Sequence, residues 1–551
     1  MADRYGAIGP ARRPGRRSPT GVHIVVPIVT ALAVLLAGAG GATVAARDHN
    51  LAGVIVREVP GHHAEAVRSV RHLGGAAGLR LSLIDGFEAR VQPAATAALR
   101  HAPGVSSVTP NAALRLSGSS DVGAASTASS ISDVADAIGA TTLWDEQVTG
   151  AGVDVALIDS GVVPVNGLTA SGKVINGPDL SFDRQAGAPA YLDTFGHGTH
   201  LASIIAGRDD ALAAGVRPGA GDFAGIAPGA RIVNVKVASA DGLTDVAQVI
   251  AAINWVVEHR RSGGLNIRVL NLSFGTDGTQ DYAVDPLAYA VEVAWRKGIV
   301  VVTAGGNAGE YRPRLTNPAV DPYVIAVGAA DLHGTLDLAD DTVPSWSSPG
   351  DATRHPDLVA PGVAVPGLRD PGSALDLAAP SATGSRLVRG SGTSQAAAVV
   401  TGAVALLLDE RPGLTPDQVK ALLTSTAARI TSVDPGAQGA GLLDVGNAGR
   451  APIPDSVQVW PRAKGTGSLE AARGSVHVQA GTSVLAGERD IFGTAWNEAE
   501  WVEEVAEGHS WDGGKWNGHT WTGDCLCASS WSGPAWSGLS SSTPTRRALS
   551  S

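Results

Sequence analysis

The chain has few cysteines, methionines and aromatic residues. Of its 551 residues only two are cysteines, Cys525 and Cys527, and both lie near the carboxyl end. They exclude a disulfide framework, and at i and i+2 they are too close for an unstrained bridge and too few for a zinc site. Methionine occurs only at Met1, and aromatic residues make up 4% of the chain. Stability must therefore come from an aliphatic core, for which 44% hydrophobic residues are ample.

Basic residues are scarcer than acidic ones. The 41 Lys and Arg residues against 52 Asp and Glu residues leave a net charge of -11, so no nucleic-acid partner is expected. The charge is uneven, because residues 1–118 hold 13 Arg, no Lys and 6 acidic residues, or +7, which leaves -18 for residues 119–551. A basic leader therefore precedes a strongly acidic body.

The amino-terminal residues predict export. A basic group, Arg12, Arg13, Arg16 and Arg17, precedes residues 21–46, which contain no charged side chain, and small residues near Ala45 suit signal peptidase. The apolar stretch is long for a signal peptide, and roughly 20 residues are enough to span a bilayer. We therefore expect residues 1–46 to be either a signal peptide of a secreted protein or an anchor at the cell surface.

Residues 51–116 have the pattern of a small separate module. Strand-like and helix-like segments alternate in the β-α-β-β-α-β order of a ferredoxin-like α+β unit. The following stretch, SGSSDVGAASTASS, has the composition of a flexible linker. We expect residues 117–137 to be a linker that contains a cleavage site.

The pattern of residues 138–449 predicts an α/β domain. Near-continuous apolar runs at 153–159, 232–237, 269–273 and 299–303 alternate with helix-length segments such as 246–259 and 284–297. That alternation indicates a parallel sheet covered by helices on both faces, which makes three layers. In such sheets the ligand sites lie at the carboxyl ends of the strands.

The tail, residues 450–551, differs again. Seven tryptophans between Trp496 and Trp536 are separated by multiples of five, and five of them begin a Trp-x-Gly unit. So short a period predicts a small repeat or solenoid. Two interpretations remain open: the indoles bind cell wall or glycan, or they form the core of the repeat itself.

Three segments place chemically active residues at the ends of predicted elements. Asp159 in LIDSG ends an apolar strand, His197 in GHGTHLA opens an apolar helix, and Ser394 in GSGTSQAAA lies where a glycine-rich loop enters a long helix. A serine hydroxyl becomes a good nucleophile when a histidine removes its proton, and a carboxylate orients that histidine and stabilises its charged form. The amino end of a helix also offers N–H groups to a developing oxyanion.

These segments resemble the three catalytic motifs of the subtilase family, in the Asp-His-Ser order known for subtilisin. AGGN at 304–307 is similar to that family's oxyanion loop, which implies that Asn307 stabilises the tetrahedral intermediate. LSFG at 272–275 is similar to its substrate strand, which implies that Ser273 and Gly275 bind the peptide.

The resemblance implies a three-layer subtilisin-like peptidase domain over residues 138–449. It further implies a secreted serine endopeptidase that acts on proteins or peptides and is made as an autoprocessed zymogen. Residues 51–116 would be its inhibitory propeptide and an intramolecular partner. No cofactor is expected. Structural calcium occurs among relatives, but no ligands can be assigned, so no metal site is predicted.

One residue departs from the family pattern. Many subtilases have methionine directly after the nucleophile, whereas this chain has Gln395. Sulfoxide cannot form there, so we expect activity to tolerate peroxide. The alternative to an enzyme is a surface or cell-wall binding protein whose protease domain is vestigial and whose tail binds the target.

Overall fold

The computed structural model describes two stretches of the chain and part of a third. They are residues 52–110 except 82–85 and 93–94, residues 130–508 except 185–189, 220, 379–385 and 481–482, and short strands between 511 and 541. The predicted export segment 1–46, most of the linker 117–137 and most Trp-x-Gly units lie outside the described residues. Within the described part, no helix is long and apolar enough to cross a membrane.

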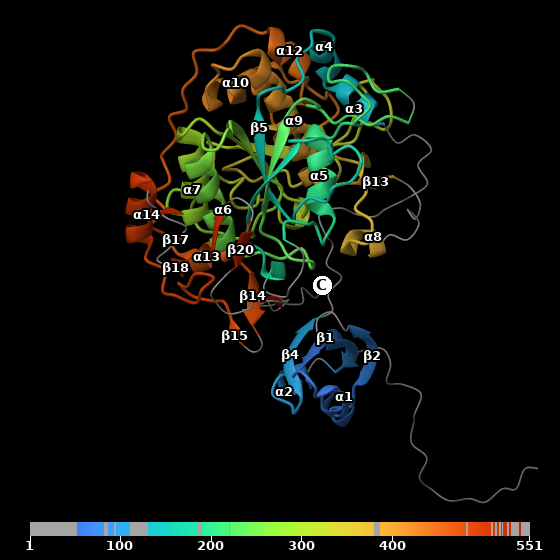
Figure 1. Ribbon diagram of the computed structural model, residues 1–551, viewed down its shortest axis with the longest axis vertical. Coiled ribbons are helices and arrows are strands. Elements are labelled where there is room, and N and C mark those ends of the chain that lie inside the picture. Colours follow the sequence, from blue (N-terminus) through green and yellow to red (C-terminus); the bar gives the residue numbers. More distant parts are fainter. Residues whose placement is uncertain are drawn as a thin grey trace, which may run out of the picture. The chain divides into compact units, whose positions relative to one another are not determined.

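The first stretch forms a small α+β unit. Its elements are β1 (Ala52–Glu58), α1 (His63–His72), β2 (Ala76–Leu81), β3 (Gly86–Val91), α2 (Thr96–Leu99) and β4 (Val105–Pro110), in the order that the sequence predicts. The strands form an antiparallel sheet of order β2-β3-β1-β4 (Figure 1). Val56, Val70, Phe87 and Leu99 are among the residues of a hydrophobic core that belongs to this unit alone.

The second stretch is built on a seven-stranded parallel sheet of order β11-β10-β9-β8-β5-β7-β6. Its strands are β5 (Asp154–Asp159), β6 (Val174–Asp179), β7 (Arg231–Lys236), β8 (Ile267–Leu272), β9 (Val300–Ala304), β10 (Ile325–Ala330) and β11 (Leu358–Pro361). Every residue of β5 and of β10 is buried. The continuous apolar runs of the sequence therefore correspond to strands with both faces covered.

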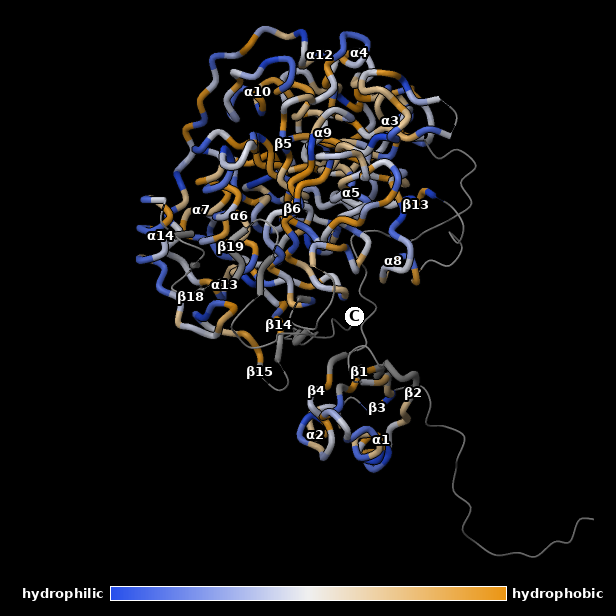
Figure 2. Tube along the Cα trace, viewed as in Figure 1, coloured by the Kyte–Doolittle hydropathy of each residue, from blue (hydrophilic) through white to orange (hydrophobic). Residues whose placement is uncertain are grey.

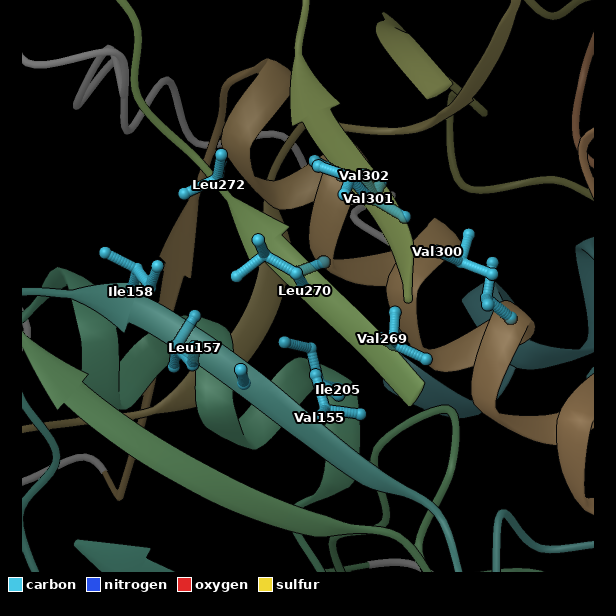
Figure 3. Packing of buried hydrophobic residues seen from close by; sticks show 14 of the residues in the cluster. Val155, Leu157, Ile158, Ile205, Val269, Leu270, Leu272, Val300, Val301 and Val302 are labelled. Carbon is cyan, nitrogen blue, oxygen red and sulfur yellow. The ribbon is translucent and has the colours of Figure 1, made fainter. Parts of the chain in front are cut away.

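Two pairs of helices cover the sheet. The helices α5 (His197–Ala206) and α9 (Thr393–Glu410) pack against each other, and so do α6 (Val246–His259) and α7 (Pro286–Arg296). In Figure 1, α6 and α7 lie on one side of β5 and α5 on the other. Figure 2 shows the hydrophobic stretches gathered around β5 and β6, inside these helices. Figure 3 shows how Val155 of β5, Val269 of β8 and Ile205 of α5 meet in this core.

The remaining elements complete this domain. They are α3 (Ile131–Ala137), α4 (Ala140–Asp145), β12 (Val365–Leu368), α8 (Ala374–Ala378), β13 (Leu387–Gly390), α10 (Pro416–Thr426), α11 (Pro435–Gln438) and α12 (Val445–Arg450). As the sequence predicts, α10 begins with a capping box between Thr415 and Gln418. Residues 131–137, which the sequence places in the linker, instead form α3, and Ile131 and Val134 lie in the main core.

Residues 451–508 pack onto this α/β domain. They contain α13 (Leu469–Arg473), β14 (Val476–Ala480), β15 (Ser483–Val484) and α14 (Glu498–Glu507). Beyond them lie the short strands β16 (Trp511–Asp512), β17 (Lys515–Trp516), β18 (His519–Thr520), β19 (Thr522–Cys525), β20 (Ala528–Ser530) and β21 (Leu539–Ser541). Trp496 and Trp501 are buried in the main core, and the ring of Trp501 meets Tyr289 of α7 at 5.4 Å. These two tryptophans share the spacing of five, yet they belong to the core rather than to a repeat.

Candidate active site

The predicted active residues meet at one edge of the parallel sheet. Asp159 ends β5, Ser273 follows β8, and Asn307 follows β9, and these three strands are neighbours. His197 is the first residue of α5, and Ser394 is the second residue of α9. Because the carboxyl ends of parallel strands share an edge, the fold brings together residues that are far apart in the sequence.

His197 is oriented by Asp159. The distance between His197 Nδ1 and Asp159 Oδ1 is 2.8 Å, and Asp159 is buried. The same Oδ1 accepts a hydrogen bond from the Ser160 backbone N–H at 2.8 Å. A carboxylate on Nδ1 requires the proton at Nδ1, so Nε2 keeps the lone pair that a general base uses.

The glycines of GHGTH allow close packing at this point. A Cβ on Gly198 would lie 2.2 Å from the carbonyl oxygen of Gly161, in the turn that follows β5. The Gly198 N–H donates to Ser160 Oγ at 2.9 Å. The first turn of α5 is thus pressed against the end of β5, and this sets the contact between His197 and Asp159.

The charge around His197 favours its protonated form. Burial by itself lowers the pKa of His197, but the charge and hydrogen bond of Asp159, with a contribution from the charge of Asp193, raise the pKa above its ordinary value of 6.5. A protonated imidazole is therefore stabilised at this position.

Ser394 is held by the end of β8. It is buried at the amino end of α9, and its hydroxyl donates to the backbone carbonyl of Ser273 at 2.7 Å. Among the described residues the hydroxyl makes no hydrogen bond to His197, so it is turned toward β8 and not toward the imidazole. Catalytic hydrogen bonds are often absent or long before substrate binds, so this geometry is compatible with a nucleophile at rest.

Asn307 is oriented by α9, the helix that carries Ser394. Its Oδ1 accepts a hydrogen bond from the backbone N–H of Thr393 at 2.8 Å. Because a backbone N–H can only donate, the amide oxygen must face Thr393, and the amide nitrogen is left to donate elsewhere. The loop is further tied to α9 by the Gly306 N–H, which donates to Thr393 Oγ1 at 3.1 Å.

The two predicted substrate residues have different surroundings. Ser273 is buried, and its Oγ donates to the carbonyl of Ser394 at 3.3 Å, so its side chain lies against the backbone of Ser394. Gly275 is exposed, and a Cβ there would lie 2.5 Å from Thr316 Oγ1. Of the pair, only Gly275 presents its backbone at the surface.

The sequence reasoning missed Asp193, Ser160 and Thr393, which hold the predicted residues in place. Ser160 and Thr393 are direct neighbours of predicted residues, but nothing in their sequence distinguishes them. Asp193 had a usable signal, since an acidic residue just before a helix is a common cap. In the part of the chain that the structure describes, no group of three or more His, Cys, Asp or Glu residues could hold a metal ion.

Comparisons with known proteins agree with this geometry. A model of the subtilase family matches residues 150–460. Serine protease AprX of Bacillus subtilis (strain 168) is 36% identical over 310 residues, which are 55% of this chain and 67% of that protein. Subtilisin DY of Bacillus licheniformis is 32% identical over 298 residues, 54% of this chain and 90% of that protein.

Two more distant matches cover less of the partner. The minor extracellular protease Epr of Bacillus subtilis (strain 168) is 28% identical over 277 residues, 50% of this chain and 35% of that protein. Fervidolysin of Fervidobacterium pennivorans, a keratinolytic enzyme related to subtilisin, matches with 25% identity and a TM-score of 0.46. That match covers 75% of this chain and 63% of fervidolysin. With the family model matched over more than half of its length, the chain belongs to the subtilase family of serine endopeptidases.

Proposed function

We propose that the protein is a secreted serine endopeptidase, made as a zymogen, that hydrolyses peptide bonds through an acyl-enzyme on Ser394. His197 is the general base, Asp159 orients it, and Asn307 with the Ser394 N–H stabilises the oxyanion. The observation that carries the proposal is the orientation of two groups at one sheet edge. Asp159 leaves His197 Nε2 free to accept a proton, and Thr393 leaves the Asn307 amide nitrogen free to donate.

The proposed reaction begins when the Ser394 hydroxyl leaves the carbonyl of Ser273 and turns to His197. Ser394 Oγ then bonds to the carbonyl carbon of the substrate while His197 Nε2 takes the hydroxyl proton. The carbonyl oxygen becomes an oxyanion and accepts hydrogen bonds from Asn307 and from the amino end of α9. His197 next gives the proton to the departing amine as the C–N bond breaks, and water hydrolyses the ester by the same steps.

Substrate binding is assigned to the strand end after β8. The exposed backbone at Gly275 offers hydrogen-bonding groups to an extended peptide, which would add as a further strand. Ser273 acts from below, where its carbonyl holds the resting hydroxyl.

The zymogen part of the proposal concerns residues 51–116. This segment has a hydrophobic core of its own, as an independently folded prosegment requires, and its basic charge complements the acidic body. Because α3 already lies in the main core, we place the maturation cleavage before Ile131, within residues 117–130 of the expected linker.

Export and surface contact are also proposals. Residues 1–46 have the charge and hydropathy of an export segment, either cleaved or retained as an anchor, and the relative Epr is named an extracellular protease. The Trp-x-Gly units after residue 510 would contact cell wall or glycan, since exposed indoles stack on sugar rings. If the protease domain were vestigial, this binding would be the whole function.

A fluorophosphonate probe separates the enzyme from a binding protein. The probe reacts with a serine hydroxyl only where a base activates it, so we expect one label per processed chain, on Ser394. The Ser394→Ala variant is the blank and should take up no label. A processed, folded chain that remains unlabelled would rule out the enzyme, and a peptide library compared with the same blank would define the cleavage preference.

A further inference from the structure

The turn that precedes His197 is organised by a buried carboxylate. Asp193 is 4% exposed, and its Oδ1 accepts hydrogen bonds from the N–H groups of Phe195 at 3.0 Å and Gly196 at 2.7 Å. Its Oδ2 accepts from the N–H of Thr199 at 2.8 Å, in the first turn of α5. One side chain thus binds the backbone on both sides of His197.

The same turn is held from outside by α8. The backbone N–H groups of Ala374 and Leu375 donate to the carbonyls of Thr194 at 3.1 Å and Phe195 at 3.0 Å. Gly196 leaves no room on this side, since a Cβ there would lie 2.5 Å from Ser373 Oγ. The backbone before His197 is therefore clamped between Asp193 and α8.

The side chain of Thr194 ties the turn to a buried ion pair. Thr194 Oγ1 donates to Asp183 Oδ2 at 2.5 Å, and the same oxygen accepts from Lys236 Nζ at 2.8 Å. Lys236 also donates to the Leu192 carbonyl at 2.7 Å. A turn whose backbone and side-chain groups are paired in this way has little freedom to move.

Asp193 also acts on the electrostatics of His197. The charge of Asp193 helps to raise the pKa of His197, after the larger contribution of Asp159. Burial raises the pKa of Asp193 itself, but the hydrogen bonds from Gly196 and Thr199 favour its charged form. Four other groups face this region: His200 on α5, Asp370 between β12 and α8, Lys236 on β7 and Asp183. None of these four groups accepts a hydrogen bond from the backbone N–H groups on either side of His197, as Asp193 does.

We infer that Asp193 is a positioning residue of the proposed protease site, which fixes the turn that carries His197 and stabilises the imidazolium by its charge. This inference rests on the proposed function. Preorganisation of this kind matters because displacing a catalytic group by about 1 Å costs on the order of 10²-fold in rate. A residue that only capped α5 would support stability and leave the proton affinity of His197 unchanged.

The chain contains a matched control for the capping role. Asp409, near the far end of α9, accepts hydrogen bonds from the N–H groups of Thr149 at 2.9 Å, Gly150 at 2.9 Å and Ala151 at 3.0 Å. Like Asp193 it binds three backbone N–H groups, but it stands at the end of α9 opposite to Ser394. Asn in place of either aspartate removes one charge and weakens the same kind of contact.

The test compares Asp193→Asn with Asp409→Asn in the full chain after processing. We expect kcat/KM of Asp193→Asn to fall by about 10²-fold, mainly through kcat. The acid limb of its pH–rate profile, where His197 becomes protonated, should move to lower pH because the protonated form of His197 loses a stabilising charge. Asp409→Asn should keep the wild-type acid limb of the pH–rate profile. It should also lose less thermal stability, because all three N–H groups donate to one oxygen of Asp409, which the asparagine oxygen can replace. Equal acid limbs in both variants would overturn the inference.

Two further measurements keep the outcomes distinct. Asp193→Glu retains the charge, so it should keep the wild-type acid limb even where kcat falls, and a shifted limb would contradict the electrostatic part. Fluorophosphonate titration counts the folded sites in each preparation, so rates are expressed per labelled Ser394. A wild-type chain that takes no label would refute the proposed function itself, which is a different outcome from unchanged kinetics in Asp193→Asn.

Discussion

The two pairs of core helices differ in the hydrogen bonds made at their amino ends. At the amino ends of α5 and α9, buried polar atoms of the described residues are left without hydrogen-bond partners: Asp159 Oδ2, His200 Nδ1 and Gln395 Oε1. At the amino end of α7, in contrast, Asp285 accepts from the N–H groups of Leu287 and Ala288 and from two side chains. Unpaired buried atoms also occur elsewhere among the described residues, with Asn317 Oδ1 beside Asp285 as one example. The contrast therefore lies in the cap, because α7 begins at a capping carboxylate whereas α5 and α9 begin at glycines that make no side-chain cap.

The amino end of α6 is completed by a residue from far along the chain. Asp245 caps α6 through the N–H of Ala247 and pairs with Arg473 Nε at 2.7 Å, with both side chains at most 2% exposed. Arg473 lies in α13, so this face of the domain is complete only when residues 451–508 are folded onto it. One helix pair thus carries the proposed reaction, and the other is stabilised by the carboxyl-terminal extension.

The largest effect on stability is expected at the amino end of α6, which the carboxyl-terminal extension completes. Arg473→Leu leaves the buried Asp245 charge unpaired, which costs about 3–5 kcal/mol of unfolding free energy, while kcat per labelled Ser394 stays at the wild-type value. Urea unfolding measures the loss. The exposed pair of Arg450 and Glu146 provides the control, because solvent screens an exposed ion pair and Arg450→Leu should cost far less stability. If Arg473→Leu lowered kcat without lowering stability, α6 would contribute to the reaction and the two helix pairs would not have separate roles.

The largest effect on rate is expected at Asn307. Asn307→Leu removes the proposed oxyanion donor and should lower kcat by about 10²–10³-fold. Asn307→Asp keeps an oxygen for the Thr393 N–H but replaces the donor with a negative charge, so it should retain the melting temperature and lose at least as much activity. Steady-state kinetics and thermal unfolding of the two variants check this. If Asn307→Asp were active, the amide would not be the donor.

Stability should depend on pH through Asp370, beside the active edge. Burial, followed by the charges of Asp193 and Asp376, raises the pKa of Asp370 from its ordinary 3.8 to about 7. The folded chain therefore binds this proton more tightly than the unfolded chain, and the wild type loses stability as pH rises from about 4 to 7. Asp370→Asn should raise the melting temperature more at pH 8 than at pH 5.

Asp376 gives the opposite sign for comparison. The hydrogen bond from Arg369 lowers the pKa of Asp376 below its ordinary value, so its stabilising effect is present above that value and lost as pH falls. Asp376→Asn should lower the melting temperature at pH 7 and have less effect in acid. The same direction of change in both variants would contradict the electrostatic account of this segment.

In the absence of peroxide, the smallest effect on activity is expected at Gln395, which directly follows Ser394. Gln395→Met supplies a sulfur next to Ser394, so peroxide should inactivate this variant while the wild type keeps its activity. Mass spectrometry of the active-site peptide detects the sulfoxide. Equal inactivation of both proteins, with Cys525 and Cys527 unmodified, would show that oxidation acts elsewhere.

The sequence was most informative where structure depends on neighbouring residues. Continuous apolar runs predicted buried parallel strands, and the capping box at Thr415 predicted the start of α10, because these signals act within a few residues. For Trp496 and Trp501, the spacing of tryptophans predicted the wrong surroundings for a related reason. A period of five is read along the chain, but burial of Trp501 is decided by Tyr289 of α7, which the spacing cannot reveal.

By itself the sequence determined the types of chemical group available and the order in which strands and helices carry them. It placed Asp159, His197, Asn307 and Ser394 at the ends of elements, and parallel strands then required these ends to share one edge. Only the tertiary structure decided their orientation. Thr393 turning Asn307, Asp193 clamping the turn before His197, and Arg473 completing α6 are contacts between distant segments, and such contacts arise from packing that no local pattern encodes.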